Sequence, residues 1–153
     1  MSEGGRMSDF MALALEEARN AAQRGEVPVG AVVVLDGQVI GQAGNRTLEL
    51  KDPTAHAEIL AVRMACEAIG NDRLSGCDLY VTLEPCTMCA GALSFARIRR
   101  LYYGADDAKG GAVENGVRFF GDPACHHAPD VYSGMAGREA SSLLKAFFAA
   151  RRQ

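Results

Sequence analysis

The hydrophobic pattern of the first third of the chain predicts one helix followed by one hairpin. Between residues 9 and 23, apolar side chains recur near helical spacing with charged residues between them. This pattern predicts an amphipathic helix that stops at Gly25. The β-prone runs 29–35 and 38–44 follow, separated only by an Asp-Gly pair. Two such runs joined by Asp-Gly predict a β-hairpin with a two-residue turn.

The middle of the chain predicts two more helices with a strand between them. We expect a helix over residues 54–69, with Thr54 as its N-cap and Gly70 closing it. Residues 78–83 have the composition of a buried strand, and Pro85 suits the start of a helix over residues 86–97.

A further strand is expected at residues 101–104. A strand, a helix and a second strand of these lengths imply a right-handed parallel crossover, and hence a layered α/β sheet with helices on its faces. Residues 105–129 are rich in glycine and predict an ordered functional loop with one helical turn. A short strand near residues 131–132 and a helix over 137–152 complete the prediction.

Composition narrows the class of protein. A chain of 153 residues that is 48% hydrophobic, without repeats or linkers, suits a single domain over residues 1–153, with residues 1–7 expected to be disordered. The longest apolar stretch, residues 29–35, is too short to span a bilayer, and no signal peptide is recognisable. We therefore expect a soluble cytoplasmic protein with no membrane partner. A net charge of -3 argues against indiscriminate nucleic-acid binding over the whole surface.

Candidate metal ligands begin both of the predicted central helices. An odd count of five cysteines in a chain expected to be intracellular directs attention to metal binding or catalysis. His56 lies in one first turn, and Cys86 and Cys89 lie three residues apart in the other. The positive end of a helix dipole stabilises thiolates there. Two thiolates and one imidazole suit one Zn²⁺ per subunit and leave its fourth position open, as in catalytic zinc sites.

Glu58 is the candidate catalytic group of this site. It follows His56 by two residues and can reach a metal-bound water without being a ligand. Each piece alone has an ordinary explanation, since a lone histidine often caps a helix and a lone C-x-x-C can be redox-active or buried. Together the pieces form a specific pattern. The remaining cysteines have no such partners and are expected to be ordinary small residues: Cys66, Cys77 and Cys125.

The H-x-E and P-C-x-x-C motifs resemble the signature of the zinc-dependent nucleobase deaminases. The segments "EVPVGAV", "DPTAHAEI", "LYVTLEPCTMCAGA", "GADDAKGG" and "FFAARR" are similar to bacterial tRNA-specific adenosine deaminases, from about Phe10 to Arg152. The resemblance implies a three-layer α/β/α cytidine-deaminase-like fold with a central mixed five-stranded sheet and helices on both faces. It also implies a homodimeric hydrolase that converts the wobble adenosine of a tRNA anticodon stem-loop to inosine.

The resemblance also assigns roles to individual residues. His56, Cys86 and Cys89 would hold zinc, and Glu58 would protonate N1 of adenine and then the leaving ammonia. The implied substrate contacts are Val29 in the wall of the base pocket, Asn45 on the flipped nucleotide, Ala55 at the base edge, Asp107 at the ribose, His127 near the mouth, and Phe147, Phe148 and Arg152 on the anticodon loop.

Without the resemblance these contacts have plainer explanations. Asn45 suits a turn, Val29 a strand core, Asp107 a loop cap and Arg152 a solvated terminus, while at least one of the adjacent phenylalanines suits the core. The chain also departs from the family pattern at "ENGVRFF" and "CHHAPD", where Ala128 replaces an arginine of many relatives. We expect this departure to affect how the segment binds RNA more than it affects the deamination chemistry.

Two other functions stay open from the sequence. A deaminase of free guanine or cytosine would share the zinc site, although the terminal "FFAARR" speaks against a small substrate. A non-catalytic zinc module could bind RNA or a partner protein. Glu58 speaks against this second alternative, since a structural zinc site is closed by a fourth ligand rather than supplied with a proton carrier.

Overall fold

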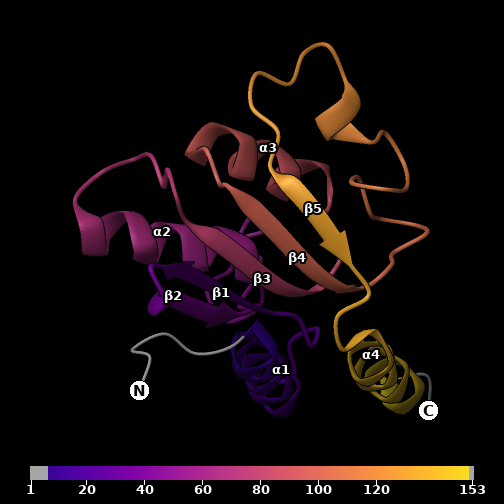
Figure 1. The fold of residues 1–153 in the computed structure, drawn as a ribbon. Helices are drawn as coiled ribbons and strands as arrows, with labels where there is room; N and C mark the ends of the chain where they lie inside the picture. The colour runs from indigo at the N-terminus through magenta and orange to yellow at the C-terminus, as the bar shows by residue number, and fades with distance from the viewer. Residues whose placement is uncertain (1–6, 152–153) are drawn as a thin grey trace.

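A computed structural model describes residues 7–151 as a five-stranded sheet between two layers of helices (Figure 1). In chain order the elements are α1 (Met7–Gln23), β1 (Gly30–Leu35), β2 (Gln38–Gly44), α2 (Ala57–Ile69), β3 (Asp78–Leu83), α3 (Thr87–Ala96), β4 (Arg100–Ala105), the 3-10 turn η1 (Phe119–Gly121), β5 (Asp130–Ser133) and α4 (Gly137–Arg151). The predicted α/β fold is confirmed. The terminus expected to be disordered lies outside the described residues except for Met7, which opens α1.

The sheet is mixed, with the strand order β2-β1-β3-β4-β5. β1 pairs antiparallel with β2 and β3, whereas β4 pairs parallel with β3 and β5. The hairpin between β1 and β2 turns at Asp36 and Gly37, which both have positive φ, 50° and 77°. A two-residue turn with this backbone matches the twist of the flanking strands, and it confirms the predicted hairpin.

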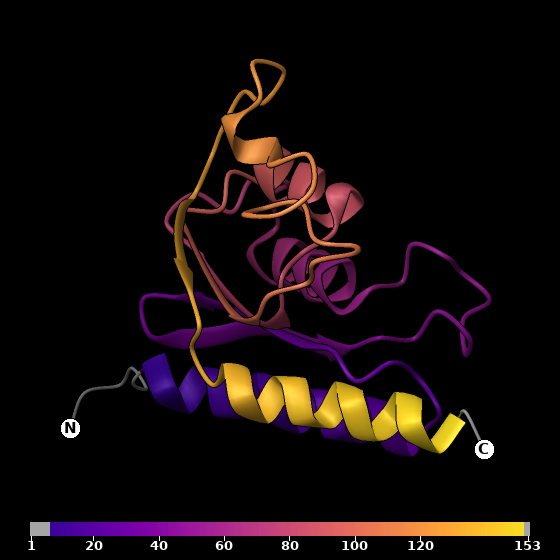
Figure 2. The same cartoon turned by 90° about the vertical axis from the view of Figure 1, so that its right-hand side faces the viewer.

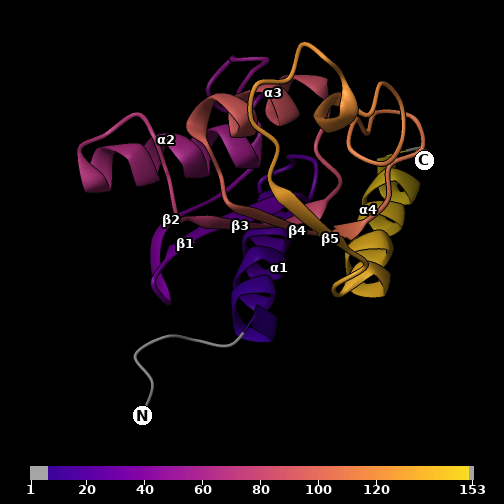
Figure 3. The ribbon, with the colours of Figure 1, turned by 45° about the horizontal axis from the view of Figure 1, so that its top comes forward.

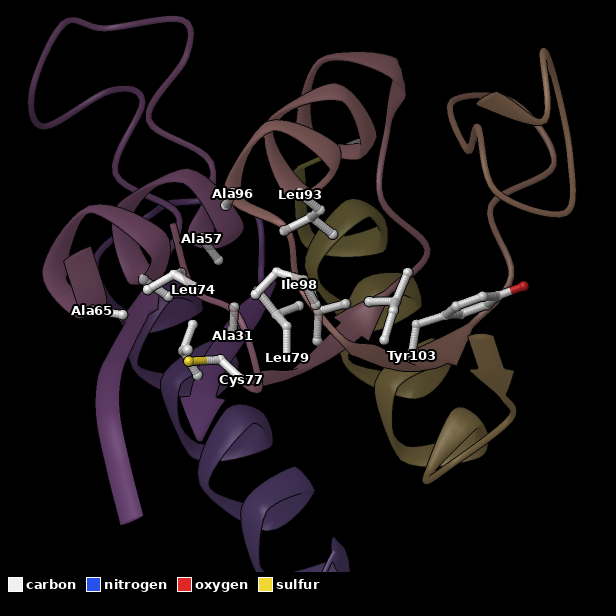
Figure 4. Packing of buried hydrophobic residues seen from close by; sticks show 14 of the residues in the cluster. Ala31, Ala57, Ala65, Leu74, Cys77, Leu79, Leu93, Ala96, Ile98 and Tyr103 are labelled. Carbon is white, nitrogen blue, oxygen red and sulfur yellow. The ribbon is translucent and has the colours of Figure 1, made fainter. Parts of the chain in front are cut away.

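Helices cover the two faces of the sheet in pairs. α2 and α3 lie on one face, and α1 and α4 lie on the other (Figure 3). Figure 2 shows α1 and α4 running side by side beneath the sheet. The main core fills the space under α2 and α3, where Ala57 and Leu93 lie over Ala31, Leu79 and Ile98 (Figure 4).

Small residues bring helices close to both faces of the sheet. A side chain at Gly30 would place its Cβ 1.9 Å from the backbone oxygen of Ala14 in α1. At Gly41 the Cβ would lie 2.3 Å from the backbone oxygen of Ala61 in α2. Because real Cβ atoms do not approach backbone oxygens so closely, these two glycines fix how near α1 and α2 can pack.

α2 does not begin where the sequence predicts. His56 is the N-cap, whereas the prediction of Thr54 was wrong. The hydroxyl and backbone N–H of Thr54 both donate to Asp52 Oδ1, at 2.7 and 2.9 Å, so Thr54 belongs to the preceding turn. Gly70 ends α2 in the left-handed conformation, as expected.

The long glycine-rich segment after β4 contains one short helical turn, η1, as predicted. None of the helices within residues 7–151 combines the length and the apolar character needed to cross a membrane.

Candidate active site

The first turns of α2 and α3 bring the three predicted metal ligands together. His56 is the N-cap of α2, and Cys86 is the N-cap of α3, with Cys89 one turn further on. Neither cap residue uses its side chain to cap the helix. Both side chains are therefore available to a ligand between the two helices, next to the end of the parallel strand β3. This is the edge of a parallel sheet at which α/β proteins bind ligands.

The spacing of the ligand atoms suits a tetrahedral ion. His56 Nδ1 lies 3.6 Å from Cys86 Sγ and 3.5 Å from Cys89 Sγ. A tetrahedral Zn²⁺, with bonds of about 2.3 Å to sulfur and about 2.0 Å to nitrogen, separates these atoms by about 3.5 Å. Within residues 7–151 this is the one group of three or more potential ligands close enough to share an ion. The donor set and its geometry fit zinc with one open position.

Hydrogen bonding favours a thiolate at this site even without an ion. The hydrogen bond from Cys89, reinforced by His56, lowers the pKa of the Cys86 thiol to about 4. The same contact with Cys86, together with burial, raises the pKa of Cys89. The hydrogen bond to Cys86 also raises the pKa of His56. These shifts favour the thiolate form of Cys86, which is the form that binds a cation.

Glu58 lies in the first turn of α2 beside this ligand group. It is only 4% exposed, and burial raises its pKa to about 7, in spite of a hydrogen bond with Cys89. A carboxyl group with such a pKa can both accept and donate a proton near neutral pH. The structure places Glu58 next to the predicted ligands, and the environment of its carboxyl group suits acid–base chemistry.

A cavity of about 330 Å³ opens above these residues. Its walls are formed by Val27, Val29, Asn45, Thr47, His56, Glu58, Leu83, Glu84, Cys86, Asp107 and Gly110. The structure therefore brings Val29, Asn45 and Asp107 into the cavity beside the ligand group, where the family resemblance implies them to be. Their contacts with a substrate stay predictions.

Asn45 has a structural function as well as a place in the cavity wall. Its Oδ1 accepts a 2.7 Å hydrogen bond from the backbone N–H of Ala57, one of the free donors at the start of α2. The side-chain NH₂ has no protein partner among the described residues. Asn45 thus holds the helix that carries His56 and keeps two donors for a ligand.

Other predicted contact residues lie at the margin of the site or away from it. Ala55 is fully buried, with its N–H donated to Asp52 and its carbonyl accepting from Arg46. His127 lies outside the cavity, in a separate groove, and its Nε2 is 2.8 Å from the backbone oxygen of Ile98. A role for His127 in substrate binding stays a prediction.

The two phenylalanines of α4 are not equivalent. Phe147 is buried and lies under the Arg151 guanidinium, 3.8 Å from its ring centroid. Phe148 is 43% exposed and lines a hollow with Asp107, next to the cavity mouth. The expectation that at least one of the pair belongs to the core is confirmed. Arg152 lies outside the described residues.

Known proteins are similar to this chain along nearly its whole length. The profile of the MafB19-like deaminases matches residues 6–152. A tRNA-specific adenosine deaminase from Agrobacterium fabrum is 70% identical over 143 residues, which cover 94% of each chain. This chain belongs to the tRNA-specific adenosine deaminase family. The family resemblance recognised in the sequence is thereby confirmed.

Two solved structures are similar in fold to this member of the tRNA-specific adenosine deaminase family. A structure from studies of A-to-I editing by tRNA:A34 deaminases at the wobble position is 71% identical and superposes with a TM-score of 0.89, covering 90% of this chain and 99% of that one. A guanine deaminase from Bacillus subtilis is 31% identical, with a TM-score of 0.66 and coverage of 97% and 96%.

The sequence did not predict that two glutamates of this adenosine deaminase family member are buried near the cavity. Glu26 accepts hydrogen bonds from the backbone N–H groups of Leu48 and Glu49, beside the cavity wall. Glu84 lines the cavity and accepts five hydrogen bonds from residues 107–115. Glu84 could have been noticed in the sequence, because it is a charged residue directly after an apolar strand and directly before Pro85 and Cys86.

Because Glu84 is buried and hydrogen-bonded as a carboxylate, we expect the free energy of unfolding to fall at acidic pH. Burial opposes ionisation, but hydrogen bonds led by those from Asp107 and Asn115 outweigh it and lower the pKa below 4.5. Its stabilising contribution is therefore complete above the unfolded pKa and lost as the pH falls through the lower folded value. In urea titrations of metal-free protein, we expect Glu84→Gln to lose less stability than the wild type between about pH 5 and about pH 3. Parallel losses would contradict this assignment.

Proposed function

We propose that this protein hydrolyses the 6-amino group of the wobble adenosine in a tRNA anticodon, forming inosine and ammonia. The observation that carries the proposal is 70% identity, over 94% of both chains, to an enzyme named tRNA-specific adenosine deaminase. The guanine deaminase is much less similar, at 31% identity, so relatedness favours RNA over a free base. Three ligands with a buried glutamate beside them favour catalysis over a purely structural zinc module.

The chemistry assigned to the site needs one zinc ion and one proton carrier. His56, Cys86 and Cys89 would hold the Zn²⁺, which would supply an activated water for the attack on C6 by lowering the pKa of that water to roughly 7. Glu58 takes a proton from the attacking water and transfers it to N1 of adenine. Glu58 then takes the remaining proton from the hydroxyl added at C6 and delivers it to the amino group, so that the C6–N bond breaks, ammonia leaves and the C6 carbonyl of inosine forms. The raised pKa of Glu58, about 7, supports both proton uptake and proton release.

The cavity wall supplies groups for holding a nucleoside. Val29 and Leu83 offer apolar surface to a base, and the free NH₂ of Asn45 offers donors. Phe148 is exposed beside Asp107 at the mouth, where an aromatic ring can stack on an unpaired base of the anticodon loop. Among the two phenylalanines, Phe148 is therefore the proposed RNA contact.

The same proposal includes a homodimer. The outer sides of α2 and α3 expose large apolar residues, among them Met64 and Met88, and Phe95 is 81% exposed. Large exposed apolar side chains on neighbouring helices are typical of protein interfaces.

Replacing Phe95 with glutamate should therefore dissociate the homodimer, because a charge would be buried at its interface. We expect sedimentation analysis to show mainly monomer for Phe95→Glu and dimer for the wild type. Phe148→Glu is the matched control, since Phe148 is exposed on α4, on the other face of the sheet. An undissociated Phe95→Glu dimer would place the interface elsewhere.

Substrate choice tests the proposed function directly. Purified zinc-loaded protein is given an anticodon stem-loop with adenosine at the wobble position, and inosine and ammonia are measured. Free adenosine, guanine and cytosine, and a stem-loop with its only loop adenosine moved by one position, are the controls. We expect turnover only at the wobble position. Turnover of a free base with an inert stem-loop would establish the small-molecule alternative, and inertness towards all substrates would favour a non-catalytic module.

A further inference from the structure

The carboxylate of Glu84 is buried in the wall of the active-site cavity and has no role in the proposed chemistry. The side chain follows β3 and precedes the ligand Cys86 by two residues, and the residue is 2% exposed. An ionised carboxylate offers about four lone-pair sites. Five donors already occupy those of Glu84, so this residue has no capacity left to bind a metal or to act as a base.

All five donors come from one loop, residues 106–115, which we call the Asp107 loop. The backbone N–H of Asp107 donates to Glu84 Oε1 at 2.9 Å, and the Asn115 side chain donates to the same oxygen at 2.6 Å. Glu84 Oε2 accepts the backbone N–H groups of Val113, Glu114 and Asn115 at 3.0, 2.8 and 3.0 Å. Hydrogen bonds to an ionised acceptor are about twice as strong as neutral ones.

The Asp107 loop is also packed directly onto this carboxylate. A Cβ at Gly111 would lie 2.5 Å from the backbone oxygen of Asp107, 2.5 Å from Glu84 Cδ and 2.6 Å from Glu84 Oε1. Since the Glu84 side chain is buried and held by five hydrogen bonds, it cannot move aside for a methyl group. The absence of a side chain at position 111 therefore allows the loop to sit against Glu84.

The anchored loop forms part of the cavity wall through Asp107 and Gly110. Asp107 Oδ1 accepts from the backbone N–H groups of Lys109 and Gly110, at 3.1 and 2.9 Å. Its other oxygen, Oδ2, has no hydrogen bond among the described residues. With the backbone N–H held by Glu84 and Oδ1 held within the loop, Asp107 keeps one acceptor for a ligand in a fixed position.

We infer that Glu84 is a positioning residue for the nucleotide substrate: it holds the Asp107 loop in its binding conformation before RNA arrives. This inference rests on the proposed function for the identity of the substrate. A loop that is already ordered loses no conformational entropy on binding, which improves affinity. Because the loop binds substrate and does not take part in proton transfer, loosening it should raise KM and leave kcat nearly unchanged.

Two substitutions test the contact from its two sides. Glu84→Gln keeps the shape of the side chain, but whichever oxygen becomes NH₂ then faces two or three donors. Gly111→Ala leaves Glu84 intact but forces the loop to shift, because the added methyl group would clash with both the Glu84 carboxylate and the backbone oxygen of Asp107. For both variants we expect KM for the stem-loop to rise on the order of tenfold, kcat to stay within about twofold, and zinc content to be unchanged.

Matched controls separate positioning from a general loss of stability. Asp78→Asn changes a buried carboxylate at the other end of β3, where it binds the Arg99 side chain instead of the Asp107 loop. Gly121→Ala adds a methyl group in η1, where it would meet no atom within 4 Å. Both controls should keep the wild-type KM at temperatures well below their unfolding midpoints.

Hydrogen exchange provides a readout that does not depend on activity. The amides of Asp107, Val113, Glu114 and Asn115 should exchange at least about tenfold faster in Glu84→Gln than in the wild type, while amides of β3 remain protected. Unchanged exchange would overturn the inference, as would an unchanged KM in both variants. Loss of zinc and of kcat would assign Glu84 to support of Cys86 instead. If the wild type does not edit the stem-loop, the proposed function fails, and the exchange result still decides whether Glu84 anchors the loop.

Discussion

Replacing Glu58 with alanine is expected to lower kcat by about 10²- to 10⁴-fold without loss of zinc. The reaction needs a group that accepts a proton from water and donates protons to the base and its leaving amino group. Glu58 is the buried carboxyl beside the ligand group, and burial raises its pKa to about 7, which suits both steps. Single-turnover measurements with the stem-loop would isolate the chemical step from binding and release.

A second variant separates proton transfer from packing around Glu58. Glu58→Gln keeps the volume of the side chain but cannot carry a proton, so we expect it to be as inactive as Glu58→Ala. Elemental analysis should give the wild-type zinc content for both, because Glu58 is not among the three clustered ligands. Near-normal turnover in either variant would remove Glu58 from the catalytic role.

Replacing Cys86 with serine should lower the zinc content from one ion per chain and abolish activity with it. Serine is a poor zinc ligand at neutral pH, and two remaining ligands hold zinc weakly. The thiol pKa of Cys86, lowered to about 4, makes it the most readily ionised sulfur of the pair. Elemental analysis after dialysis against a weak chelator would measure the loss.

Cys66→Ser is the matched control for this experiment. Cys66 is a partly buried thiol on α2 that does not belong to the ligand group. We expect this variant to keep its zinc and its activity. Unchanged zinc stoichiometry in Cys86→Ser would mean that the assigned ligand set is wrong.

Local pattern was sufficient to predict most of the fold. The hairpin follows from Asp36-Gly37, whose backbone supplies the turn that the strands need. The pairing of Cys86 with Cys89 on one face follows from helical spacing alone. The predicted N-cap of α2, Thr54, was wrong because the Thr54 hydroxyl donates to Asp52 instead. The N–H of Ala57 is satisfied by Asn45, which lies in another segment.

The sequence by itself determined the periodic elements, the turn chemistry and the family, and it predicted the metal ligands and the proton-transfer group. Each of these is encoded by residue types a few positions apart, or by a motif. The tertiary structure alone decided that Phe147 is buried while Phe148 is exposed, that His127 lies in another groove, and that Glu84 holds the Asp107 loop. Burial and hydrogen-bond partners depend on segments distant in the chain, such as Glu84 and Asp107, which are 23 positions apart. They therefore exist only once the sheet and its helices have packed.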